Sequence, residues 1–236
     1  MALYLIPTPI SEEALDTLPA GVCDIARRLE VFVVERAKSA RRFVKRLNPQ
    51  RPLEEITFLE FDRDGRLTPE VAALFEQAVC QGRDVGLLSE AGCPAVADPG
   101  AALVALAHRL QVPVVPLVGP SSILLALMAS GLNGQCFAFH GYLPAKRPEL
   151  VRRLRQLEQQ ARQYNQTQLF METPYRTAWL FDIALNTLQF DTAFGIAQDL
   201  TGPNAFIHTQ TVGEWKAGSV APAALPTIFL IGLPAG

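Results

Sequence analysis

The 236-residue sequence lacks the short motifs that mark several common enzyme classes. It contains no G-x-G-x-x-G after an apolar run, no G-x-x-x-x-G-K-[ST], no G-x-S-x-G and no H-E-x-x-H. The usual dinucleotide-binding, P-loop, hydrolase and zinc-protease interpretations therefore lose their support. The three histidines are spread along the chain, and we interpret them as structural residues rather than ligands.

Cysteine and charge are also scarce. The four cysteines form no C-x-x-C, which predicts reduced thiols and neither a disulfide framework nor a metal site. Charged residues make up only 19% of the chain against 49% hydrophobic residues, so a mainly disordered state is excluded. The net charge of −2 excludes a protein that binds polyanions over its whole surface.

Long uninterrupted apolar runs are missing as well. The most apolar window, residues 112–132, contains three prolines and two glycines, which argues against a membrane-spanning helix. The chain begins without the basic segment and small-residue cleavage site of a signal peptide. We therefore expect a soluble, cytoplasmic protein without membrane contact.

Short apolar runs instead alternate with helical segments, which indicates an α/β fold. Strands are predicted at residues 3–6, 31–34, 56–61, 85–88, 112–118, 137–140, 168–171, 194–197, 205–211 and 227–231. Helices are predicted after Thr68-Pro69, an N-cap followed by an N1 proline, and at residues 123–130, 148–163 and 174–188. We expect a mostly parallel N-terminal domain, residues 1–117, and a mixed-sheet C-terminal domain, residues 118–236.

Two strand-end loops carry the most informative residues. Ser89–Gly100 follows one predicted strand, and Gly119–Ser122 follows the next at a helix start. Ligands of α/β sheets bind beyond the carboxyl ends of strands, and the free N–H groups of a helix start suit polar ligand atoms. A purely structural interpretation, with Asp98 and Ser121 capping the following helices, stays open at this point.

Five segments together resemble the tetrapyrrole methylase superfamily, and most closely its branch of bacterial 16S ribosomal RNA (cytidine-2′-O)-methyltransferases. The segments are Tyr4–Ile10 (YLIPTPI), Ser89–Gly100 (SEAGCPAVADPG), Val115–Ser122 (VPLVGPSS), Phe139–Pro144 (FHGYLP) and Phe170–Arg176 (FMETPYR). The resemblance implies two α/β domains, S-adenosylmethionine (SAM) bound in the cleft between them, and a homodimer. It also implies that SAM contacts Pro9, Glu90, Gly92, Cys93, Pro94, Val96, Ser121, Ser122, Met171 and Leu200 or Thr201.

Methyl transfer from SAM requires alignment of the acceptor and loss of its proton, and no metal. For a ribose hydroxyl, the candidate catalytic residues are Glu35, Arg36 and Arg176, with Glu172 beside Arg176. Glu35 and Arg36 stand where this branch has an acidic-led motif, and Arg176 matches its E-S-P-x-R arginine. The alternatives are a solvated helix start for Glu35 and Arg36, and a local ion pair between Arg176 and Glu172.

Two basic clusters favour contact with RNA phosphates. Residues 36–51 contain seven basic and no acidic side chains, and a second cluster spans residues 146–155. A carboxylate-rich tetrapyrrole would also be attracted, and plain solvated helix faces would produce the same pattern.

Some segments depart from the RNA-methylating pattern. Ser11–Glu13 replaces G-N-L, Glu35–Lys38 replaces an acidic-Thr-Arg motif, and Gln198–Gly202 replaces R-E-L-T-K. We therefore retain two hypotheses. The first is a SAM-dependent methyltransferase of ribosomal RNA, with a tetrapyrrole or another small molecule as the alternative acceptor. The second is a SAM-binding module that has lost catalysis.

Overall fold

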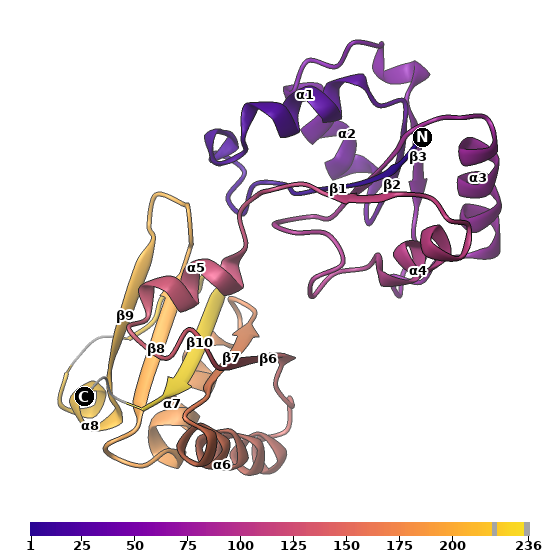
Figure 1. Ribbon diagram of the computed structural model, residues 1–236. Coiled ribbons are helices and arrows are strands. Elements are labelled where there is room, and N and C mark those ends of the chain that lie inside the picture. The colour runs from indigo at the N-terminus through magenta and orange to yellow at the C-terminus, as the bar shows by residue number, and fades with distance from the viewer. Residues whose placement is uncertain (219–220, 234–236) are drawn as a thin grey trace. The chain divides into compact units, whose positions relative to one another are not determined.

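The computed structural model describes residues 1–218 and 221–233, and the chain forms two compact units (Figure 1). The first unit is Met1–Ser121, and the second begins at Ser122. Each unit contains its own five-stranded sheet, as expected for an α/β protein. The division falls four residues after the predicted one, at the start of a helix.

The N-terminal unit is built on a fully parallel sheet in the order β3-β2-β4-β1-β5. Its strands are β1 (Leu3–Ile6), β2 (Val31–Val34), β3 (Thr57–Glu60), β4 (Val85–Leu88) and β5 (Val114–Pro116). β2 and β4 are buried at every position, because helices cover both faces of the sheet. This burial explains why both strands are continuous apolar runs.

Four α-helices cover this sheet, two on each face: α1 (Ala20–Arg28), α2 (Ala37–Arg46), α3 (Pro69–Cys80) and α4 (Ala101–Arg109). Short 3₁₀ helices occupy Leu15–Thr17 and Leu53–Glu55. The predicted cap of α3 is confirmed, since the Thr68 hydroxyl accepts a hydrogen bond from the Val71 N–H at 3.3 Å. Val44 and Leu47 of the α2 region are buried, so the basic face of this helix is its outer face.

The second unit has a mixed sheet in the order β6-β7-β10-β8-β9, with only β6 and β7 parallel. The strands are β6 (Phe137–Tyr142), β7 (Thr167–Glu172), β8 (Ala193–Gln198), β9 (Phe206–Thr211) and β10 (Thr227–Gly232). The helices are α5 (Ser122–Ala129), α6 (Arg147–Tyr164), α7 (Thr177–Thr187) and α8 (Val212–Ala217). The predicted mixed sheet is confirmed.

A stack of phenylalanine rings forms the centre of the second core. The Phe229 ring on β10 lies 5.7 Å from that of Phe170 and 5.5 Å from that of Phe194. Trp215 packs in the same core and donates a hydrogen bond to the Phe194 carbonyl at 2.7 Å. Successive strand residues face opposite sides, so Ile228 lies on the other face, where α5 packs against β10.

Helix α7 begins three residues later than predicted. The sequence favoured Pro174 as the first helical residue, but the Thr173 carbonyl accepts the N–H groups of Arg176 and Thr177 and closes a turn there.

Among the described residues, no helix is long and apolar enough to cross a membrane.

Replacing Phe229 by alanine should lower the free energy of unfolding of the second unit by about 3–5 kcal/mol, because a buried ring leaves a cavity. Both tryptophans, Trp179 and Trp215, lie in this unit, so urea unfolding followed by tryptophan fluorescence reports on it selectively. Phe190→Ala, which removes a ring that is 72% exposed, is the matched control and should cost less than about 1 kcal/mol. Equal losses in the two variants would contradict the assigned core.

Candidate functional site

Three loops follow the adjacent strands β4, β1 and β5, and two of them are joined by a pair of backbone hydrogen bonds. The Thr8 N–H donates to the Gly92 carbonyl at 2.9 Å, and the Gly92 N–H donates to the Thr8 carbonyl at 3.0 Å. The Ser89 hydroxyl adds a hydrogen bond to the Gly92 carbonyl at 3.3 Å. The carboxyl ends of β1 and β4 are thereby held together where α/β sheets bind ligands.

The third loop contacts the other two. The Cys93 thiol donates a hydrogen bond to the Pro120 carbonyl at 3.4 Å, and burial raises the pKa of Cys93, which keeps it a thiol. Gly119 lies so close to Pro7 that a Cβ atom there would be 2.2 Å from the proline ring. Glycine is therefore required at position 119 for the loops after β1 and β5 to pack.

The loop after β4 contains several residues with left-handed backbone conformation. Gly92 has φ +79°, and Ala95 and Ala97 have φ +65° and +62°. Two alanines in this region cost on the order of 1–3 kcal/mol each, and such residues cluster at ligand-binding sites. A Cβ on Gly92 would meet only the Pro120 carbonyl oxygen within 4 Å, so the space beside this glycine is open.

Three carboxylates, Glu35, Glu90 and Asp98, lie at this edge of the sheet. Burial, then the charge of Glu35 and to a smaller extent that of Glu90, raise the pKa of Asp98 to about 6, although a hydrogen bond with Ser89 opposes the shift. Burial and the charge of Glu90 raise the pKa of Glu35, and the nearby Arg36 lowers it. Two of these groups thus titrate closer to neutral pH than ordinary carboxyls, a property of many proton-transfer sites.

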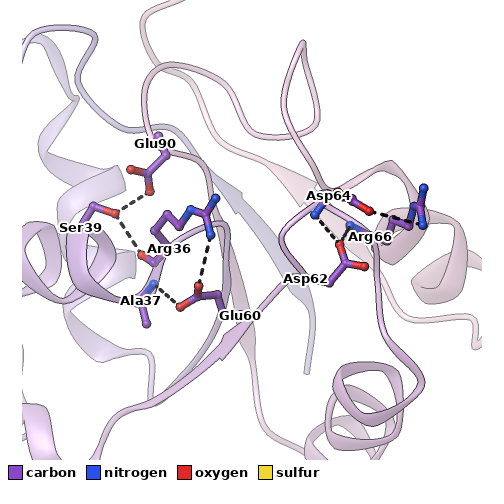
Figure 2. Close-up of polar contacts among 8 residues, drawn as sticks. All are labelled: Arg36, Ala37, Ser39, Glu60, Asp62, Asp64, Arg66 and Glu90. Atoms are coloured by element: carbon purple, nitrogen blue, oxygen red, sulfur yellow. Dashed lines mark hydrogen bonds and ion pairs between the residues drawn. The ribbon is translucent and has the colours of Figure 1, made fainter.

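Figure 2 shows how the neighbouring polar groups are arranged. The Ser39 hydroxyl on α2 donates to Glu90 at 2.5 Å. Glu60 at the end of β3 accepts from the Ala37 N–H at 2.8 Å, and its other oxygen lies 3.8 Å from an Arg36 nitrogen. Arg36 therefore has an acidic partner and is directed toward β3. In the turn after β3, Asp62 accepts from the N–H groups of Asp64 and Arg66.

The structure brings most of the predicted residues of the N-terminal unit to one edge of its sheet. Pro9 follows the Thr8 bridge, Glu90 to Val96 lie in the loop after β4, and Ser121 ends the loop after β5. Gly92 and Pro94 are buried, whereas Val96 is 49% exposed. Glu35 and Arg36 follow β2 at the same edge, with Arg36 as the N-terminal flanking residue of α2.

The remaining predicted residues belong to the second unit. Ser122 begins α5, and Met171 is the penultimate residue of β7. Leu200 is buried just after β8, and Arg176 directly precedes α7. Since β7 and β8 run in the same direction on either side of β10, three of these residues, Met171, Arg176 and Leu200, lie at one edge of the mixed sheet.

Arg176 forms the predicted local ion pair with Glu172, at 3.2 Å. Glu172 is 3% exposed, and its other carboxylate oxygen accepts from the Thr173 N–H at 2.8 Å. Arg176 also donates to the Pro144 carbonyl at 3.4 Å, and its guanidinium lies 4.9 Å from the centre of the Trp179 ring. These contacts fix the turn between β7 and α7.

The N-terminal unit itself neutralises part of the basic cluster at residues 36–51, since three of the seven cations, Arg36, Arg42 and Arg51, form ion pairs. Arg42 forms an ion pair with Glu12, and Arg46 donates to the Glu12 carbonyl. Arg51 pairs with Glu30 at 3.0 Å. The sequence showed seven cations without an intervening acid, but it could not show that acidic residues from other segments pack against them.

Asp98 is the residue whose role the sequence misjudged. The structural interpretation made it the cap of the next helix, which is wrong: α4 begins after Gly100 without a side-chain cap. Its pKa is raised first by burial and then by the charge of Glu35, a residue 63 positions away in the chain, so no local pattern could indicate the shift. Among the described residues, no group of three or more histidine, cysteine or acidic side chains could hold a metal ion.

The fold and the interlocked strand-end loops define an α/β protein with its candidate ligand site at the carboxyl edge of a parallel sheet. Residues 2–216 match the family model of the tetrapyrrole (corrin/porphyrin) methylases, so the chain belongs to this family.

Two curated relatives are both named ribosomal RNA small subunit methyltransferase I. The Mesorhizobium japonicum relative is 33% identical over 211 residues, which cover 89% of this chain and 67% of the relative. The Vibrio cholerae relative is 29% identical over 199 residues, which cover 84% of this chain and 65% of the relative. This chain thus spans about two thirds of the length of these relatives.

A solved structure shares the fold. It is uroporphyrin-III C-methyl transferase from Thermus thermophilus, complexed with S-adenosylhomocysteine. The superposition has a TM-score of 0.53 and 17% identity and covers 98% of this chain and 97% of the other.

Replacing Glu35 by glutamine should lower the pKa of Asp98 from its value of about 6, because a neighbouring negative charge that disfavours ionisation is removed. The measurement is a carbon-13 NMR titration of the Asp98 carboxyl between pH 3 and pH 9. Glu60→Gln is the matched control: this carboxylate ends β3 at the same sheet edge but is not among the charges that shift Asp98. An unchanged midpoint in Glu35→Gln would show that the two carboxyls do not interact.

Proposed function

We propose that the protein is a SAM-dependent methyltransferase that modifies small-subunit ribosomal RNA at the ribose 2′-oxygen of a cytidine. The observation that carries the proposal is that three strand-end loops are joined in a chain of this methylase family. Hydrogen bonds join Thr8 with Gly92 and Cys93 with Pro120. The names of the two relatives support the RNA substrate, and the bound S-adenosylhomocysteine of the solved structure supports the cofactor.

The residues at the edge of the parallel sheet fit SAM. The open space beside Gly92 admits a ligand next to backbone N–H and carbonyl groups, as close approach to a cofactor requires. The carboxylates Glu35, Glu90 and Asp98 provide negative charge that complements a sulfonium cation. In the proposal, the residues of this unit that hold the cofactor are Pro9, Glu90, Gly92, Cys93, Pro94, Val96 and Ser121. The contacts that the family resemblance implies for Ser122, Met171 and Leu200 of the second unit stay a prediction.

When bound, SAM supplies a methyl group activated by its positively charged sulfur. The chain's task is to align the acceptor oxygen with that methyl and to take up the hydroxyl proton as the new O–C bond forms and the S–C bond breaks. Glu35 is the proposed proton acceptor, since its raised pKa favours proton uptake near neutral pH. Arg36, oriented by Glu60, and Arg176, oriented by Glu172, supply positive charge at the edges of their sheets.

We further propose that RNA phosphates contact the basic cluster at residues 146–155 more than the one at residues 36–51. Arg147, Arg152 and Arg155 are exposed on α6, and within the described parts of the chain none of them forms an ion pair. Lys146 pairs only with Glu149, at 3.9 Å. Among the described residues, four of the five cations at residues 146–155 are without an ion pair, against four of the seven at residues 36–51. Unpaired cations contribute more to phosphate binding than cations already neutralised by their own protein.

A SAM-binding module without catalysis is the second candidate, and one segment favours it. Gln198 stands where this branch has arginine, and it is 2% exposed and donates to the Ala223 carbonyl at 2.9 Å. Asp199 accepts from the Asn204 N–H within its own loop. These side chains replace a cation of the related methyltransferases. A tetrapyrrole remains the alternative acceptor, supported by the family to which the chain belongs.

The assembly and location are further parts of the proposal. We propose a cytoplasmic homodimer, because Met128 on α5 is 79% exposed and Phe206 and Ile207 on the edge strand β9 are each 37% exposed. Exposed apolar side chains of this size are typical of association surfaces. Sedimentation velocity at micromolar concentration should give the mass of a dimer, and a monomer would contradict this part.

The cofactor site is tested by titration calorimetry with SAM. Gly92→Trp and Ser121→Trp should abolish binding, because an indole would fill the space beside the loops. The matched control is Gly82→Trp, which carries the same bulk at φ +76°, nearly the conformation of Gly92, in a position with nothing within 4 Å. Unchanged SAM affinity in Gly92→Trp, or equal losses in Gly82→Trp, would contradict the assigned site.

Methyl transfer tests the activity itself. Small ribosomal subunits isolated from cells lacking the modification should accept tritium from methyl-labelled SAM, and nuclease digestion should release labelled 2′-O-methylcytidine. Incorporation should fall at least tenfold in Glu35→Gln. Binding of SAM without transfer to ribosomal subunits or tetrapyrroles would favour the non-catalytic module and overturn the proposed activity.

A further inference from the structure

Exposed aromatic side chains gather where β6 and β7 end in the second unit. Tyr175, in the turn between β7 and α7, is 95% exposed, and Trp179 on α7 is 37% exposed. Tyr142, the last residue of β6, is 57% exposed and pairs in register with Met171 of β7. Because the two strands are parallel neighbours, the loops that follow them leave the same edge of the sheet.

The turn that carries Tyr175 is held in one conformation. Its neighbour Arg176 is bound by Glu172, by the Pro144 carbonyl and by the face of Trp179. The contact with Pro144 also joins the turn to the loop after β6. Tyr175 itself is almost wholly exposed, so its ring contributes little to the core, while the contacts of Arg176 anchor the turn that carries it.

The loop joined to this turn is positively charged. Residues 142–153 contain Lys146, Arg147, Arg152 and Arg153 and a single acidic residue, Glu149. The Lys146 side chain is 81% exposed, and Arg147, the first residue of α6, is exposed as well. The Pro144 carbonyl accepts the hydrogen bond from Arg176. Lys146 and Arg147 are two and three residues further along the chain, so they lie close in sequence to this contact with the aromatic turn.

We propose that this aromatic–basic surface, formed by Tyr142, Lys146, Arg147, Tyr175 and Trp179, binds single-stranded RNA. A base stacks on the Tyr175 ring, and phosphates contact Lys146 and Arg147. Proteins bind single-stranded RNA with aromatic rings beside cations. The unpaired bases stack on the rings, and the phosphates of the backbone contact the cations. The bases of a duplex stack on one another, so they cannot stack on the Tyr175 ring. The inference rests on the proposed RNA substrate and specifies where and in what form it binds.

Fluorescence anisotropy with a fluorescein-labelled 12-nucleotide RNA tests the surface. Tyr175→Ala should weaken binding by about 5- to 150-fold, the range for loss of one base stack, and Tyr175→Phe should retain wild-type affinity. The matched control is Tyr164→Ala, which removes a tyrosine that is 58% exposed at the far end of α6. A blunt duplex of the same sequence should bind equally to the wild type and Tyr175→Ala.

Salt dependence tests the phosphate contacts. Arg147→Ala should reduce the slope of log affinity against log salt concentration by about 0.7, the value for one phosphate contact with a single strand. Arg109→Ala, which removes an exposed arginine at the end of α4, should leave the slope unchanged.

The outcomes separate this inference from the proposed function. If the wild type and Tyr175→Ala bind the single strand equally well, the proposed surface is wrong. The proposed RNA substrate is not affected by that result. Wild-type protein that binds SAM by calorimetry but no RNA would overturn both the RNA substrate and the surface. A dimer that dissociates on Tyr175→Ala in sedimentation velocity would show that a second copy of this chain covers the ring, and would also overturn the surface.

Discussion

The two hydrogen bonds between Thr8 and Gly92 are the constraint on which the candidate site depends. They join the loop after β1 to the loop after β4, and the Cys93 and Gly119 contacts then add the loop after β5. A left-handed glycine at position 92 makes the close pairing feasible, and Ala95 and Ala97 in the same loop also have left-handed backbone. Without this pairing, three independent loops would lack the shared backbone surface that a cofactor needs.

Charge divides the molecule into regions of opposite sign. Carboxylates gather at the edge of the parallel sheet, where burial and mutual repulsion raise the pKa of Glu35 and Asp98. Three of the seven cations of residues 36–51 are paired with Glu12, Glu30 and Glu60. In the loop joined to the Tyr175 turn, Lys146 pairs with Glu149 at 3.9 Å, and Arg147 forms no ion pair with any described residue. A cationic cofactor therefore suits the first region, and a polyanion suits the last.

Much of the fold could be predicted because its signals are local. β2 and β4 are buried on both faces and read as apolar runs, and Thr68-Pro69 carries its own cap for α3. The start of α7 was predicted three residues early, because the sequence does not show that the Thr173 carbonyl closes a turn against the anchored Arg176. The candidate site is predicted from its strand-end loops, whereas the effect of Glu35 on the pKa of Asp98 and the partial neutralisation of the first basic cluster depend on residues distant in sequence. Such pairs become evident only in the folded chain.

The most direct test of the central claim is amide hydrogen exchange with and without saturating SAM, read by mass spectrometry. The account predicts slower exchange in peptides covering Ser89–Gly100 and Leu117–Ser121, with little change in α3 (Pro69–Cys80) on the same unit. Saturation with SAM that leaves both loops unprotected, or that protects α3 instead, would contradict the assignment of the cofactor to the carboxyl edge of the parallel sheet.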